Sequence, residues 1–179
     1  RQAYDHLLFL ASISIIYSFK TWKKLFWIVT FFTIGHSMSL VISSYGIYKP
    51  NTDIIEFLIP VTIIISALSN IFFLDTNKKI NYFTILIALF FGLIHGFGFA
   101  NFFSQISFSD GVDLVALIGF SLGVEVSQIL IAVSILVLNS ILFWNSNKFK
   151  KNYIRIISLL VCLLTILTVS YTHLRAHET

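Results

Sequence analysis

The chain has 179 residues, of which 57% are hydrophobic and only 11% are charged, and its formal net charge is +4. Soluble domains carry roughly 25% charged residues, so this composition excludes a water-soluble protein and indicates one that lies in a lipid bilayer. The basic residues are scattered between apolar segments and are not interleaved with base-stacking aromatics, which argues against nucleic acid as a partner.

Six apolar segments of membrane-crossing length follow one another and are separated by short polar clusters. About 20 apolar residues cross a hydrocarbon core of roughly 30 Å, so each segment is expected to be a spanning helix. Asn51 is expected to cap the third helix, and Asp110 or Asp113 to open the fifth. The predicted fold is an all-α, polytopic membrane bundle with helices at 4–19, 22–46, 52–74, 81–103, 112–143 and 153–172.

One domain is expected over residues 1–172, and both ends of the chain look unusual. Arg1 leads almost directly into an apolar run, so we expect the amino end to be truncated. Residues 173–179 resemble translated adaptor or vector sequence, and the two histidines there are set aside. The one cysteine, Cys162, lies in an apolar run and is interpreted as a buried structural thiol.

The basic residues near the helix ends predict the orientation of the chain. Between the second and third helices and between the fourth and fifth, the only basic residue is Lys49. The positive-inside rule therefore predicts that both termini lie outside. The loops expected in the cytoplasm are those after the first, third and fifth helices, with Lys20, Lys23, Lys24, Lys78, Lys79, Lys148, Lys150, Lys151 and Arg155.

Ionisable residues break the apolar pattern at four places inside the predicted spanning helices: Asp5 with His6, His36, His95 and Glu125. An ionised group at mid-bilayer costs roughly 2.5 to 3.5 kcal/mol on insertion scales, so such groups normally face the bundle interior and find partners there. His6, His36 and His95 each lie 14 residues from a residue at the cytoplasmic end of the predicted helix. Fourteen residues of α-helix span about 21 Å. The three histidines are therefore predicted to share one layer in the outer half of the membrane.

Other polar residues are predicted to extend this layer into a route. Moderate tilt of the fifth helix would bring Glu125 towards the histidines, and Gln128 lies one turn deeper. Ser39 shares a helix side with His36, and Asn70 belongs to a polar strip nearer the cytoplasm. We therefore expect Gln128, Asn70 and Ser39 to line a path for a transported ion.

Imidazoles and carboxylates from separate helices suit a borderline divalent cation such as Ni²⁺, Co²⁺ or Zn²⁺. Cu(I) is disfavoured because the nearby sulfur, in Met38, points off the His36 face. Two other functions use the same residues. A metal-dependent hydrolase would use Glu125 as the general base, and a haem-binding electron carrier would use His36 and His95 as axial ligands. A single histidine in a membrane helix can also serve as a helix-to-helix hydrogen-bonding group.

Four sequence motifs occur in an order that resembles the HupE/UreJ family over nearly the whole chain. The resemblance implies an inner-membrane nickel or cobalt permease, with accessory or metallochaperone proteins as candidate partners. Asp5, His6, His36, His95 and Glu125 would then handle the metal, and Asn70 matches a polar position of the family pattern. Ser69 departs from that pattern, which has an acidic residue there. The motifs are Asp-His-Leu-Leu-Phe at 5–9, Phe-Thr-x-Gly-His-Ser at 32–37, His-Gly-x-Gly-Phe-Ala at 95–100 and Gly-Val-Glu-x-x-Gln at 123–128.

Overall fold

The computed structural model describes residues 2–72, 82–106, 114–142 and 150–176, and within these ranges the chain is helical and has no strand. The predicted all-α fold is confirmed. Asp110, Asp113, Lys78, Lys79 and Lys148 lie outside the described residues. The elements are α1 (Gln2–Ser14), a 3₁₀ helix η1 (Phe19–Thr21), α2 (Trp22–Ser44), α3 (Thr52–Phe72), α4 (Tyr82–Ile106), α5 (Leu114–Leu142) and α6 (Lys150–Ala176).

Five helical segments are long and apolar enough to cross a membrane, so the chain is a multi-pass membrane protein. They are Phe19–Ser44, Thr52–Phe72, Tyr82–Ala100, Val115–Leu142 and Lys150–Ser170. The remaining helix, α1, has 13 residues and is therefore about 20 Å long, less than the roughly 30 Å of a hydrocarbon core. The prediction of six helices is right, whereas the described part of α1 is too short to cross the membrane.

Helix α1 also ends earlier than the predicted range of 4–19, because its last turn is held by side chains of other helices. Asn70 of α3 donates a hydrogen bond to the carbonyl of Ser12 at 2.6 Å. Asn139 of α5 donates to two carbonyls beyond the helix end, at 3.0 Å and 3.2 Å. The carbonyls at a helix end have no partner inside the helix, so these amides allow α1 to stop at Ser14 within the protein interior.

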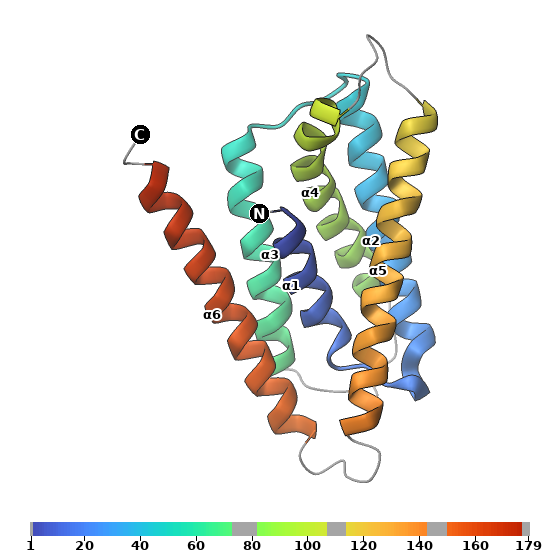
Figure 1. Cartoon of the computed structure of the whole chain (residues 1–179), viewed down its shortest axis with the longest axis vertical. Coiled ribbons are helices and arrows are strands. Elements are labelled where there is room, and N and C mark those ends of the chain that lie inside the picture. The colour runs from blue at the N-terminus through green and yellow to red at the C-terminus, as the bar shows by residue number, and fades with distance from the viewer. Residues whose placement is uncertain (1, 73–81, 107–113, 143–149, 177–179) are drawn as a thin grey trace.

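The short helix α1 lies between α3 and α5, with α4 behind it, in the view of Figure 1. It contacts α3, α4, α5 and α6. Phe9 packs into a core cluster with residues of α2, α3, α4 and α6, and Leu10 packs into a second cluster with residues of α2 and α5. Side chains carried by α1 therefore reach the centre of the fold.

Helices α2 and α4 form the most extensive contact in the bundle, and glycines make it possible. A Cβ atom added to Gly35 would overlap the carbonyl oxygen of Leu89 on α4. One added to Gly92 would overlap the carbonyl oxygen of Phe32 on α2. Small residues let the two backbones touch, and this close approach sets the spacing of the side chains on either side of it.

The ends of the helices agree with several local predictions. The side-chain oxygen of Asn51 accepts a hydrogen bond from the backbone N–H of Asp53 at 2.8 Å, so the predicted cap of α3 is confirmed. The starts of α2 and α6, whose sequences include Lys23 and Lys151, lie at one end of the bundle, and the segment between α2 and α3, whose sequence includes Lys49, lies at the other (Figure 1). Which end faces the cytoplasm stays a prediction.

Candidate functional site

Three histidines from three different helices meet inside the bundle. The ring of His6 on α1 lies 5.3 Å from that of His36 on α2 and 5.0 Å from that of His95 on α4, measured between centroids. His36 and His95 are fully buried, and His6 is 9% exposed. The predicted shared layer thus forms a contiguous group of three imidazoles, called the histidine cluster below.

Phenylalanine rings enclose the histidine cluster. Phe32 lies 5.3 Å from the His95 ring, and Phe9 lies 4.9 Å from the same ring. Phe99 lies 4.7 Å from the ring of His6. These apolar rings lower the dielectric around the imidazoles, which strengthens any electrostatic contact made there.

Several ring nitrogens of the histidine cluster are buried without a hydrogen bond. His95 Nε2 lies 2.9 Å from the hydroxyl of Thr62 on α3. His95 Nδ1 and both nitrogens of His36 have no hydrogen-bond partner among the described residues. A buried polar atom without a partner is costly, and such atoms often mark the place of a ligand or an ordered water.

The histidine cluster is not a preformed metal site. Over the described ranges, no three His, Cys, Asp or Glu side chains are grouped so that they could hold a metal ion together. The ring of His6 is nearly perpendicular to those of His36 and His95, at 89° and 79°. A cation would therefore require ring rotation. Asp5, 4% exposed, is buried on the same turn of α1 as His6.

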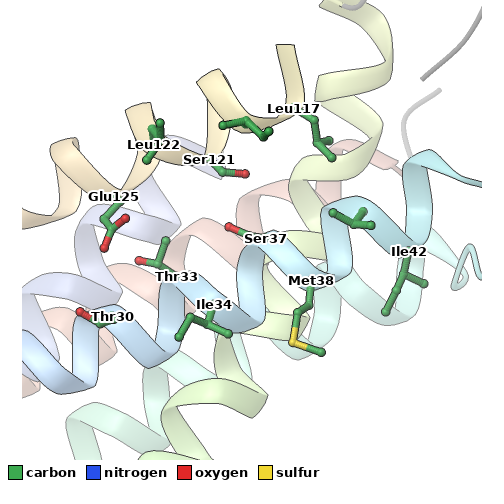
Figure 2. Close-up of a pocket in the computed structure, with 12 residues that line it drawn as sticks. Thr30, Thr33, Ile34, Ser37, Met38, Ile42, Leu117, Ser121, Leu122 and Glu125 are labelled. Atoms are coloured by element: carbon green, nitrogen blue, oxygen red, sulfur yellow. The ribbon is translucent and has the colours of Figure 1, made fainter. Parts of the chain in front are cut away.

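Glu125 lies apart from the histidine cluster, in a groove of about 560 Å³ between α2 and α5. Figure 2 shows its carboxylate on the side of α5 that faces Thr33, with Ser37 and Ser121 further along the groove. His36 does not line this groove and is fully buried, because it projects from a different side of α2. The groove is therefore lined by Glu125 but by none of the three histidines.

Three of the predicted path residues take part in hydrogen bonds between or within helices. Thr33 donates to the side-chain oxygen of Gln128 at 2.8 Å, which links α2 to α5. Ser39 donates to the carbonyl of His36 at 2.9 Å and sits against Gly96 in the contact between α2 and α4. Asn70 binds α1, as described above.

Helix α3 carries a polar strip whose first member the sequence analysis missed. Thr62, Ser66 and Asn70 are spaced four residues apart, so they lie on one face of α3. Thr62 contacts His95, and the hydroxyl of Ser66 lies 2.6 Å from that of Ser12 on α1. The spacing was readable from sequence, but a membrane-helix threonine often bonds only its own backbone, and so Thr62 gave no signal of its own.

The chain matches the model of the family described as HupE / UreJ protein over residues 1–175. The chain belongs to the HupE/UreJ family. This family is associated with nickel and cobalt transport or accessory functions. No curated protein and no solved structure gave a significant match.

The motifs that carry the HupE/UreJ resemblance converge only in part. Those that contain His6, His36 and His95 meet at the histidine cluster. In the fourth motif, Glu125 lines the groove, and Gln128, 2% exposed, accepts a hydrogen bond from Thr33, which lines the same groove. Two polar regions of this HupE/UreJ protein therefore lie on different sides of α2.

Proposed function

We propose that this HupE/UreJ protein is a permease for a divalent transition-metal cation, with Ni²⁺, Co²⁺ and Zn²⁺ as the candidates. The observation that carries the proposal is the contact of His6, His36 and His95 in a buried cluster, with ring nitrogens that lack hydrogen bonds. In this proposal the cation is the transported substrate and binds to the cluster only transiently. Transient binding is consistent with rings that must reorient to hold the cation.

The chemistry of the histidine cluster suits this class of cargo. Imidazole nitrogen is a preferred ligand of borderline divalent cations, whereas Mg²⁺ and Ca²⁺ prefer oxygen. A cation that leaves water loses hydration energy, and neutral imidazoles in a low-dielectric shell of phenylalanine rings replace part of it. Because the three rings come from three helices, a movement of any of these helices would change the geometry of the binding site.

A route away from the histidine cluster follows the polar strip on α3. Thr62 contacts His95, Ser66 and Ser12 lie next, and Asn70 lies one further turn along α3. Beyond Thr62, the hydroxyl oxygens of Ser66 and Ser12 and the amide oxygen of Asn70 replace water ligands of a cation that moves along α1. With the predicted orientation, this strip leads from the outer half of a bacterial inner membrane towards the cytoplasm.

Replacing His36 by phenylalanine tests the proposed function. We expect His36→Phe to reduce nickel, cobalt or zinc accumulation by cells that express the protein to the level of cells without it. Phenylalanine keeps an aromatic ring at this position, but both nitrogens of the imidazole are lost. Metal content of washed cells measures the effect by mass spectrometry, with membrane-inserted protein quantified in parallel.

Cys162→Ala is the control for this experiment. Cys162 is a buried thiol on α6 and the one cysteine of the chain. The substitution therefore removes a different kind of metal-binding side chain from the same membrane protein. Accumulation should be unchanged in Cys162→Ala. Equal accumulation by His36→Phe and the parent, at equal protein levels, would rule out the histidine cluster as the cargo site.

Glu125 gives a second prediction, because its carboxylate lies in the groove and not at the histidine rings. We expect Glu125→Gln to leave the Co²⁺ affinity of the purified protein close to that of the parent. Isothermal titration measures the affinity. A loss of Co²⁺ affinity as large as the loss measured for purified His36→Phe would instead place the carboxylate among the ligands.

A further inference from the structure

We propose that Thr62 is a positioning residue that fixes the tautomer of His95 and makes Nδ1 the atom that binds the cation. The inference rests on the proposed function, because it concerns the same cluster. Thr62 itself does not contact the cargo in this proposal. It acts through its hydrogen bond to the far side of the His95 ring.

The positions of the protons follow from the partners of the Thr62 hydroxyl. The Thr62 oxygen lies 2.7 Å from the carbonyl oxygen of Ile59, which can only accept a hydrogen bond. The single hydroxyl proton is therefore directed to Ile59. The same oxygen lies 2.9 Å from His95 Nε2, so in that contact it accepts and the ring nitrogen donates.

This assignment determines what the other ring nitrogen can do. A neutral imidazole carries one N–H, so a proton on Nε2 leaves a lone pair on Nδ1. His95 Nδ1 is buried and has no hydrogen-bond partner among the described residues. The lone pair is the form of the nitrogen that can bind a cation, and Thr62 holds the proton on the opposite side of the ring.

The reverse tautomer is less favourable in these surroundings. If Thr62 donated to Nε2, the proton would sit on Nδ1 as a buried donor without an acceptor among the described residues. His95 is fully buried, so lipid or bulk water could not supply that acceptor. An unpaired buried donor costs about 1–3 kcal/mol.

Outer partners of this kind are common around metal-binding histidines. A histidine ligand almost always donates its second ring N–H to an acceptor, which orients the ring, and loss of the partner typically weakens metal binding about 10- to 100-fold. The threonine hydroxyl is an acceptor in this arrangement only because its own proton is committed to the backbone of α3.

Three threonine variants of the full chain separate positioning from packing. Thr62→Val removes the acceptor at nearly constant volume, and we expect its Co²⁺ affinity to be about 10- to 100-fold weaker. Thr62→Ser keeps the hydroxyl and should restore affinity close to that of the parent. Thr165→Val is the matched control, because Thr165 is 1% exposed on α6 and its hydroxyl donates to the carbonyl of Val161, in its own helix, at 2.8 Å.

The tautomer can be measured directly without metal. In protein with ¹⁵N-labelled histidine, the signals lost in His95→Gln identify His95, and we expect a protonated Nε2 and an unprotonated Nδ1. In Thr62→Val this preference should weaken. A parent with the proton on Nδ1 would overturn the inference, as would Thr62→Val with unchanged Co²⁺ affinity. A parent that binds none of Ni²⁺, Co²⁺ and Zn²⁺ would overturn the proposed function and this inference together.

Discussion

Gly92→Ala should prevent stable association of α2 with α4. An added Cβ would overlap the carbonyl oxygen of Phe32, a backbone atom that cannot rotate away as a side chain would. Overpacking a well-packed core typically costs about 1–3 kcal/mol and occasionally more, and we expect Gly92→Ala to be at or above that range. Thermal unfolding in detergent, followed by circular dichroism and size-exclusion elution, measures the loss.

Gly123→Ala supplies the control for this prediction. Gly123 lies on α5, and a Cβ added there meets no atom within 4 Å. Both substitutions make the same change in helix propensity, so the difference between them isolates the contact between α2 and α4. Gly123→Ala should be neutral or slightly stabilising. Similar melting temperatures for the two variants would contradict the close backbone contact.

Asn70→Leu should stop metal accumulation while leaving metal binding in place. The substitution removes the side-chain amide at the end of the polar strip and puts an apolar side chain beside the end of α1. Because Asn70 lies beyond Ser66 and away from the histidine rings, the cargo would still bind but would lack oxygen ligands on its way out. Cell-associated metal and the affinity of the purified protein, measured on the same variant, separate the two steps.

Asn139→Leu is the matched comparison. Asn139 also donates to carbonyls near the end of α1, but it projects from α5 and lies off the strip on α3. We expect Asn139→Leu to lower stability, since it leaves buried carbonyls without partners, yet to retain accumulation per folded molecule. If both variants lose accumulation equally, the common cause is the anchoring of α1, and the route along α3 is wrong.

Most of the helices were predictable because a spanning segment needs a long apolar run and its ends need caps. Asn51 shows how a local signal defines an end, since the residue that caps α3 directly precedes it. The end of α1 had no such signal. It depends on Asn70 and Asn139, which are distant in sequence, and the apolar run itself continues to residue 19.

The histidine cluster was predictable in depth, and Glu125 marks the limit of that method. Residue counting along helices gives the position along the membrane normal, so it correctly grouped His6, His36 and His95. It does not give the direction in which a side chain projects, and for Glu125 that direction leads into the groove between α2 and α5. The Thr62 contact required coordinates, because it depends on two hydrogen bonds made by a single hydroxyl.

The origin of the three imidazoles on separate helices has a thermodynamic consequence. The glycine contact joins α2 to α4, whereas His6 belongs to the short central helix α1. A cation held by all three rings acts as a cross-link between these parts, and a ligand that binds only the folded state adds about 2.7 kcal/mol of stability at 100 times its dissociation constant. The cargo of the proposed permease would thus stabilise the packing of α1 against α2 and α4 while it is bound, and its release would remove that contribution.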